Sequence, residues 1–278
     1  MLARRIPVLA ALAAMALALG ACAPKRALVS PILYPTAWVQ TSAEYEAAAR
    51  QAFNAAARAL DAALADSTWT AALEQTGDFA ALPPAIITDV DETMLDNSPF
   101  EARMARAGLV YDDPAFDTWV ESAEAGPVPG ALEFATEAAR RGVTIFYVSG
   151  RGQALEEATR RNLERRGFPL DPGVDVVPAT GEQPEWTSDK TSRRAWIASR
   201  YRVLLVIGDD LNDFVNGRVP LERRAQLVRE NAERWGRRWI VIPNPIYGSW
   251  ERALYDFESG LSDAEKARRV AERLDARE

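Results

Sequence analysis

The sequence contains no histidine and only one cysteine among its 278 residues. The missing histidine excludes histidine phosphatases, Ser-His-Asp hydrolases and His-ligated zinc sites. A single cysteine can form neither an intrachain disulfide nor a thiolate cluster that binds a metal. Hydrolytic chemistry in this chain therefore has to use carboxylates, Lys, and Ser or Thr, with a hard cation as the natural addition.

Acidic residues outnumber basic residues by 40 to 33, so the chain carries a formal net charge of -7. Such a chain has no electrostatic reason to bind nucleic acid or an anionic membrane surface, and nucleic acid is not an expected partner. The 278 residues, 48% of them hydrophobic, are enough for one sizeable core with or without a small appended lobe.

Residues 1–21 predict a secretory signal peptide. A short basic start precedes an apolar run over residues 6–19, which is shorter than the roughly 20 residues needed to span a bilayer. The run leads into Leu-Gly-Ala-Cys, which resembles a bacterial lipobox in which Cys22 is lipidated. The alternative is an ordinary signal peptide that happens to contain a cysteine.

We expect residues 22–38 to tether the lipid anchor to a domain over residues 39–278, because this segment contains three prolines. Ala23, rather than Asp, follows the cysteine. By resemblance to sorted lipoproteins, this indicates the outer membrane of a Gram-negative bacterium. The membrane is thus an expected partner through the lipid on Cys22.

Apolar runs alternate with helical patterns along the domain. Near-continuous apolar strands separated by helices predict an α/β fold in which helices flank a parallel sheet. A long helix is expected to begin at Thr41, where Thr-Ser-Ala-Glu has the capping-box pattern, and a capped, charged helix from Ser262. The other predicted elements are strands at 85–90, 143–149, 203–208 and 239–242, and helices at 130–141, 153–166, 190–200 and 221–235.

Carboxylates gather where two of the predicted strands end. Asp89 and Asp91 follow the first strand, and their i, i+2 spacing places both on the same side of an extended backbone. Asp209 and Asp213 follow a later strand and reach the same edge of the sheet. So many acids would repel one another, and oxygen ligands of this kind suit Mg²⁺ best.

A hydroxyl and an amine are expected at the same edge. Ser149 ends the strand at 143–149, and Lys190 begins a predicted helix. With two carboxylates present, one acid can attack phosphorus while the other stands near the leaving oxygen. A phosphoryl-transfer site would need this combination of residue types.

Two long motifs carry a family resemblance. Asp-Val-Asp-Glu-Thr-Met-Leu-Asp-Asn-Ser-Pro at residues 89–99 and Val-Ile-Gly-Asp-Asp-Leu-Asn-Asp-Phe at 206–214 resemble the two signatures of the class C non-specific acid phosphatases. These bacterial lipoproteins of the 5′-nucleotidase type form subfamily IIIB of the HAD-like superfamily. Three positions depart from the usual family pattern, namely Phe100, Gly150 and Asp210.

The resemblance covers nearly the whole mature chain and implies a fold. It implies a HAD-like, Rossmann-like parallel sheet flanked by helices, with a small and mostly helical lobe. Residues 39–82 and 97–125 are the candidates for that lobe.

The resemblance also implies roles for four catalytic residues. Asp89 would be the nucleophile that forms an aspartyl-phosphate, and Asp91 would protonate the leaving alkoxide and later deprotonate water. Lys190 would offset charge on the phosphoryl oxygens, and Ser149 would donate a hydrogen bond to them.

A magnesium site is implied in the same way. Asp89 and Asp209 would bind Mg²⁺ through their side chains, and Asp91 through its carbonyl oxygen. Asp213 would hold the waters of the metal or the lysine.

Aromatic residues in the loops are candidates for substrate contact. In the family, such rings stack on substrate rings such as nucleobases, and Tyr111, Trp119 and Tyr247 align best with them. Ordinary core packing is the competing interpretation for each of the three.

The predicted activity is Mg²⁺-dependent hydrolysis of phosphate monoesters outside the cytoplasm. The resemblance implies small-molecule substrates such as nucleoside monophosphates and aryl phosphates, and a preference for acid pH. Two alternatives stay open, a phosphotransferase that uses alcohol acceptors and a non-catalytic surface-binding lipoprotein on the same scaffold. A homodimer is a further option.

Overall fold

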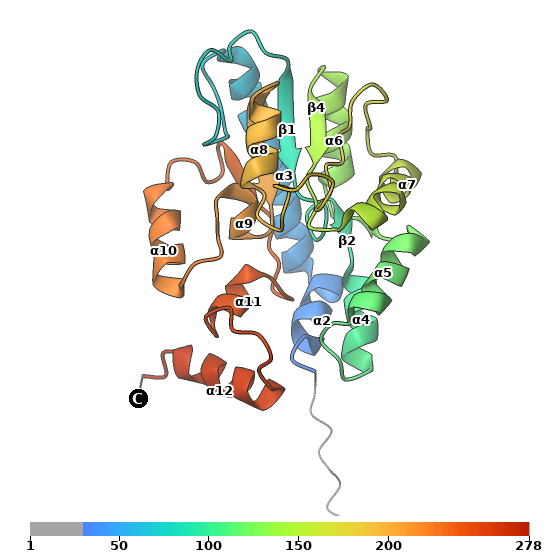
Figure 1. Ribbon diagram of the computed structural model, residues 1–278, viewed down its shortest axis with the longest axis vertical. Coiled ribbons are helices and arrows are strands. Elements are labelled where there is room, and N and C mark those ends of the chain that lie inside the picture. Colours follow the sequence, from blue (N-terminus) through green and yellow to red (C-terminus); the bar gives the residue numbers. More distant parts are fainter. Residues whose placement is uncertain (1–29, 278) are drawn as a thin grey trace, which may run out of the picture.

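The computed structural model describes residues 30–277, which form an α/β fold around one parallel sheet (Figure 1). The strands of this sheet are β1 (Pro84–Thr88), β4 (Thr144–Tyr147), β5 (Arg202–Gly208) and β6 (Trp239–Val241). Their spatial order is β4-β1-β5-β6, and every pairing is parallel. Each strand overlaps a predicted one, which confirms the expected α/β class.

The remaining elements follow the predicted alternation. Helices α6, α7, α8 and α10 fall within the four stretches predicted as helical, and α12 lies in the predicted C-terminal helix. In chain order, the elements outside the main sheet are α2 (Leu33–Thr41), α3 (Ala43–Ala65), β2 (Leu95–Asp96), α4 (Ser98–Arg106), α5 (Asp113–Ser122), β3 (Gly126–Pro127), α6 (Ala131–Arg140), η1 (Gln153–Leu155), α7 (Glu156–Arg166), α8 (Thr191–Ala198), α9 (Leu211–Phe214), α10 (Leu221–Glu230), α11 (Ser249–Ala253) and α12 (Asp263–Arg273).

Both faces of the sheet are covered, which explains the uninterrupted apolar strands. All seven residues of β5 are buried. Helix α3 contacts β5, β6 and α6 on one face, and α8 contacts β5; Figure 1 shows α8 in front of the sheet and α3 behind it. An apolar strand without alternation is the pattern expected for burial on two faces.

The predicted tether is wrong for residues 33–38, because they belong to helix α2. Ile32, Thr36 and Val39 are buried with the i, i+4, i+7 spacing of one helical face, and α2 contacts α4. Pro35 lies in the first turn, where its missing N–H removes no helical hydrogen bond. The predicted signal peptide, Cys22 and residues 22–29 lie outside the described residues.

Helix α3 begins two residues later than predicted. Its N-cap is Ser42, whose Oγ accepts a hydrogen bond from the backbone N–H of Tyr45 at 3.1 Å. Thr41 instead ends α2, with its Oγ1 donating to the carbonyl of Ala37. The prediction grouped this helix with α4 and α5 in one lobe. Helix α3 instead packs on the sheet.

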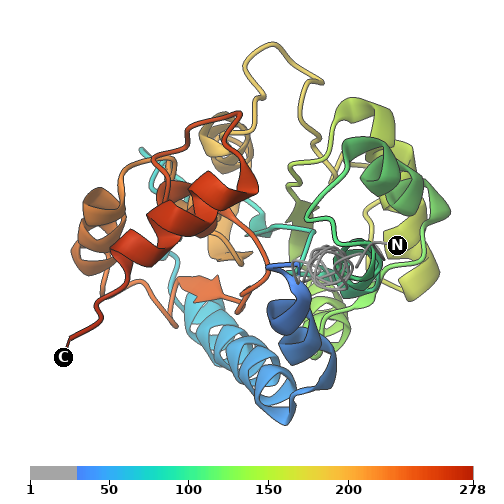
Figure 2. The ribbon, with the colours of Figure 1, turned by 90° about the horizontal axis from the view of Figure 1, so that it is seen from below.

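Helices α4, α5, α11 and α12 lie beyond the carboxyl ends of the strands (Figure 1). Viewed from below, α4 and α5 stand on one side and α12 on the other (Figure 2). Within residues 30–277, no helix is long and apolar enough to cross a membrane. The strand ends and these helices frame the region where the predicted site residues meet.

Candidate active site

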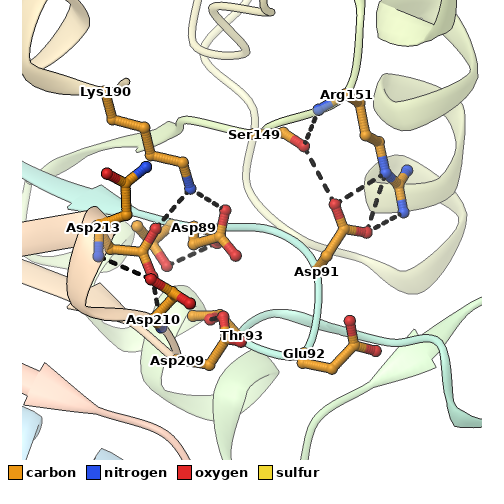
Figure 3. A network of polar contacts seen from close by, with 12 residues as sticks. Asp89, Asp91, Glu92, Thr93, Ser149, Arg151, Lys190, Asp209, Asp210 and Asp213 are labelled. Atoms are coloured by element: carbon orange, nitrogen blue, oxygen red, sulfur yellow. Dashed lines mark hydrogen bonds and ion pairs between the residues drawn. The ribbon is translucent and has the colours of Figure 1, made fainter. Parts of the chain in front are cut away.

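The loop after β1 sends its two acids to different partners. Asp89 directly follows the strand, and its backbone N–H donates to the carbonyl of Ile207 at 2.9 Å, which holds it beside β5. The chain then turns at Glu92, whose φ of 56° lies in the left-handed region. Figure 3 shows the Asp89 carboxylate facing Lys190, whereas Asp91 faces Arg151.

Lys190 connects the two motifs through buried ion pairs. Its Nζ donates to Asp213 Oδ1 at 2.6 Å and to Asp89 Oδ1. All three side chains are buried. Burial lowers the pKa of Lys190, but the charges of Asp213 and Asp89 outweigh it and raise that pKa overall, so the amine stays cationic.

Asp89, Asp209 and Asp213 form a candidate metal site. Each offers a carboxylate oxygen, and these oxygens all lie within 4.8 Å of one another. Burial, followed by the charges of Asp89 and Asp213, raises the pKa of Asp209 well above its ordinary value. Three mutually repelling carboxylates, two of them buried and that of Asp209 partly exposed, form a donor set that fits a hard divalent cation.

Two polar side chains fix the orientation of Asp209. Thr93 Oγ1 donates to Asp209 Oδ1 at 3.0 Å, and Asn244 Nδ2 donates to Asp209 Oδ2 at 2.8 Å. One hydrogen bond on each carboxylate oxygen leaves a second lone pair free on each. Asp209 can therefore be held in place and still bind a cation.

The second motif needs its glycine. A Cβ atom on Gly208 would lie 2.2 Å from Oδ2 of Asp213, so any larger residue would displace that carboxylate. Asp213 Oδ2 also accepts from the backbone N–H of Asp210 at 2.9 Å. Asp210, which the sequence could not distinguish from a solvated turn residue, caps α9 and accepts hydrogen bonds from Ser249 at the start of α11.

Asp91 is held on the other side of Asp89 by Arg151. Arg151 donates to Asp91 Oδ1 from Nη2 at 2.7 Å and from Nε at 3.0 Å. Ser149 Oγ donates to Asp91 Oδ2 at 3.2 Å (Figure 3). Burial would raise the pKa of Asp91, but the charge and hydrogen bonds of Arg151 outweigh it and lower that pKa.

Sequence reasoning missed three polar residues of this site. Arg151 is one; the others are Asn97, which donates to Asp91 Oδ1 at 2.8 Å, and Glu92, which accepts from the backbone N–H of Asn97 at 2.8 Å. Both Glu92 and Asn97 lie within the first motif and are buried. The sequence signal that could have identified Glu92 and Asn97 is their place in a motif at a strand end, because the polar residues of such a motif are rarely all exposed.

Two of the three predicted substrate-contacting aromatics line the cavity at this edge. Tyr111 and Tyr247 line a cavity of about 640 Å³ that also contains Asp89 and Lys190. Trp119 does not line it: this residue is 6% exposed, and its Nε1 donates to Asn97 Oδ1 at 2.8 Å. The structure therefore contradicts the predicted substrate contact of Trp119, because its indole N–H already supports Asn97.

Glu101 lines the same cavity and should make stability depend on pH. Its side chain is 3% exposed, and burial with the charge of Asp91 raises its pKa to about 8. The folded state therefore keeps a proton that the unfolded chain loses above pH of about 4.5. Between these two pKa values, each rise in pH lowers the free energy of unfolding. Above about pH 8 the stability that the Glu101 proton contributes is fully lost.

Glu101→Gln removes this titration. We expect the variant to match the wild type in Tm at pH 5 and to exceed it by several °C at pH 8. The titration should change the free energy of unfolding by a few kcal/mol, and each kcal/mol shifts Tm by about 2–4 °C in a protein of this size. Calorimetry at the two pH values measures the difference. Glu121→Gln, an exposed change on α5, is the control. A Tm difference that is the same at both pH values would contradict the assignment.

Comparisons with known proteins agree with this geometry. A family model described as HAD superfamily, subfamily IIIB (acid phosphatase), matches residues 13–250. The structure of a class C acid phosphatase from Bacillus anthracis is similar with a TM-score of 0.80 and 33% identity, over 91% of this chain and 100% of that one. With tungstate bound, that phosphatase matches with a TM-score of 0.78.

A plant relative is more distant. Acid phosphatase 1 of Solanum lycopersicum is 26% identical over 162 residues, which cover 58% of this chain and 57% of that protein. The match thus spans a little more than half the length of this curated relative. The shared part includes neither protein in full.

Proposed function

The chain belongs to subfamily IIIB of the HAD superfamily, the acid phosphatases, and we propose that it is a Mg²⁺-dependent phosphomonoesterase with Asp89 as nucleophile. One observation carries the proposal. A cluster at the carboxyl ends of the strands joins the buried Asp89 to the ammonium of Lys190 and to the metal-ligand candidates Asp209 and Asp213. Phosphoryl transfer requires a nucleophile with positive charge placed around it.

The proposed reaction has two steps. In the first, an Asp89 oxygen attacks phosphorus, the ester P–O bond breaks, and the leaving alkoxide takes the proton of Asp91. In the second, water attacks the aspartyl-phosphate, its proton goes to Asp91, and phosphate leaves as the Asp89 carboxylate is restored. Arg151 lowers the pKa of Asp91, so the protonated acid that the first step needs is populated only at acid pH, which agrees with the expected preference for acid pH.

The other polar residues position these groups. Lys190 holds the Asp89 carboxylate and offsets charge on the phosphoryl oxygens, and Ser149 Oγ lies where it can donate to them. Asp89, Asp209 and Asp213, with the carbonyl of Asp91, would hold Mg²⁺. Bound there, the ion supplies the positive charge that offsets the developing charge of the phosphoryl group.

The proposed substrates are nucleoside monophosphates and aryl phosphates. Tyr111 and Tyr247 line the cavity, and a substrate ring could stack on either. The proposed location is the outer membrane of a Gram-negative bacterium, with residues 1–21 removed and a lipid on Cys22. A homodimer is retained as an alternative to a monomer.

Phosphate release tests the proposal directly. The protein is incubated with p-nitrophenyl phosphate and with a panel of nucleoside monophosphates in the presence of Mg²⁺, and released phosphate is measured. An added alcohol that yields a new phosphate ester would favour the phosphotransferase alternative. A folded, Mg²⁺-loaded protein that releases no phosphate would favour a non-catalytic binding lipoprotein.

Asp91→Asn should discriminate between leaving groups. We expect kcat/KM for an alkyl phosphate to fall about 10²- to 10⁴-fold, because the alkoxide then leaves without a proton. p-Nitrophenolate needs no proton, so kcat/KM for its ester should fall far less. Steady-state kinetics on the two esters measures the contrast, and an equal loss on both would contradict the general-acid role.

A further inference from the structure

The cavity wall formed by α4 and α5 contains a buried carboxyl group that no step of the proposed reaction uses. Glu101 lines the cavity, is 3% exposed, and accepts no side-chain hydrogen bond or ion pair within residues 30–277. A buried carboxyl without a partner is costly and calls for an explanation. Because Glu101 lines the cavity, a ligand bound there can supply the missing partner.

The surroundings of Glu101 are acidic and aromatic. Asp113 and Asp117 line the same wall, together with Tyr111 and Phe116, whose ring centroids lie 5.7 Å apart. Burial and the neighbouring charge of Asp113 raise the pKa of the Tyr111 hydroxyl, as expected for a negative potential there. Carboxylates beside aromatic rings are the combination that recognises organic cations.

No basic side chain of this wall offsets these acids. Between residues 98 and 122, no Lys or Arg lines the cavity. Arg103, on α4, lies 5.8 Å from the ring of Trp119 instead. Arg151 lines the cavity beside this wall, with its guanidinium 5.8 Å from the Phe116 ring centroid, but it is already bound to Asp91 and, through Nη1, to Thr159 at 3.0 Å.

The opposite side of the cavity contains the basic side chains. Arg252 and Lys266 line it from α11 and α12, with Glu251 beside them, and Arg218 lines it from the loop between α9 and α10; α12 stands across from α4 and α5 in Figure 2. A charged leaving group would therefore be oriented, with its positive end toward α4 and α5. Clefts lined by one sign of charge raise the local concentration of ligands of the other sign.

We propose that Glu101, Asp113 and Asp117, with the ring of Tyr111, recognise a positive charge on the alcohol part of the substrate. The preferred substrates are then phosphate monoesters of ammonium alcohols rather than of neutral alcohols. This proposal rests on the phosphomonoesterase function proposed above and names the substrate class of the same site. On binding, the substrate cation takes the place of the proton that Glu101 keeps in the free protein, and it gives the carboxylate the partner that the protein itself does not provide.

Two isosteric esters test this preference. Phosphocholine and 3,3-dimethylbutyl phosphate have leaving groups of the same shape, but only the first carries a cation. We expect wild-type kcat/KM to be at least about tenfold higher for phosphocholine, the size expected for a close charge pair in a cleft. Glu101→Gln should lower this ratio to about two to three, the part that Asp113 and Asp117 still supply.

Two further variants keep the test decisive if Glu101→Gln folds poorly. Asp117→Asn changes an exposed residue and should lower the ratio about two- to threefold. Glu121→Gln removes the same charge from the same helix but outside the cavity, and should leave the ratio unchanged.

The outcomes separate this inference from the proposed function. A wild-type ratio near one, with both esters hydrolysed, overturns the inference and leaves the phosphomonoesterase intact. A high ratio that neither Glu101→Gln nor Asp117→Asn reduces overturns the assignment to this wall. If p-nitrophenyl phosphate and both esters resist hydrolysis, the proposed function fails, and the substrate preference fails with it.

Discussion

Replacing Asp89 with asparagine is expected to lower kcat for p-nitrophenyl phosphate by at least about 10⁴-fold. An amide oxygen is a poor nucleophile, the chain has no histidine, and the neighbouring carboxylates of Asp213 and Asp91 are already held in ion pairs. Asp213 is bound to Lys190, and Asp91 is bound to Arg151. The covalent route would therefore be closed.

The variant should remain folded. Burial raises the pKa of Asp89 even though Lys190 opposes the shift, so the site tolerates a neutral group at this position. Lys190 keeps its ion pair with Asp213. Thermal unfolding should give a Tm within a few °C of the wild type, which separates loss of chemistry from loss of fold.

Trapping the intermediate completes this test. Acid quenching of the wild type during turnover, followed by peptide mass spectrometry, should locate one phosphoryl group on the peptide that contains Asp89. Asp61→Asn is a matched control, since this Asp lies on α3 with a side chain 69% exposed. A wild-type rate in the Asp89 variant, or a phosphoryl group on another residue, would exclude Asp89 as nucleophile.

The sheet and its reactive edge could be predicted because their signals are local. A run such as Val203–Gly208 without polar interruptions indicates a strand buried on both faces. Once the strands are parallel, their carboxyl ends meet at one edge. The positions of Asp89, Asp209 and Lys190 near one another then follow from sequence order alone, and the ion pairs of Lys190 agree with this expectation.

Contacts between distant segments could not be predicted in this way. Arg151 pairs with Asp91 across 60 positions, and no periodicity determines which of several arginines turns inward. Trp119 has the aromatic character of a substrate contact, yet the rotation of α5 directs its indole to Asn97. Residues 33–38 look like a linker because of Pro35, but burial of Thr36 and Val39 against neighbouring elements decides the outcome.

Removal of the metal is expected to have the second largest effect. If Mg²⁺ binds at Asp89, Asp209 and Asp213, EDTA should lower kcat by at least about 10³-fold, and added Mg²⁺ should restore it. Saturation at 100 times Kd stabilises a protein by about 2.7 kcal/mol, which corresponds to a rise in Tm of about 5–10 °C at this size. The Tm readout does not depend on turnover.

Asp209→Asn should reverse the order of stability with and without Mg²⁺. Without the ion, the variant removes one of three mutually repelling carboxylates and should unfold at a higher temperature than the wild type. With the ion, the wild type gains the binding energy and the variant gains little, so the order inverts.

A second acidic group provides the control for this inversion. Glu156, Asp175 and Glu182 also bring carboxylate oxygens within 4.8 Å, but Arg160 donates to two of them and already offsets their charge. Asp175→Asn should therefore leave the Mg²⁺-dependent rise in Tm unchanged. If Asp175→Asn removed this rise in Tm and Asp209→Asn kept it, the ion would bind at Glu156, Asp175 and Glu182. The positive charge that offsets the carboxylates around Asp89 would then have to come from Lys190 alone.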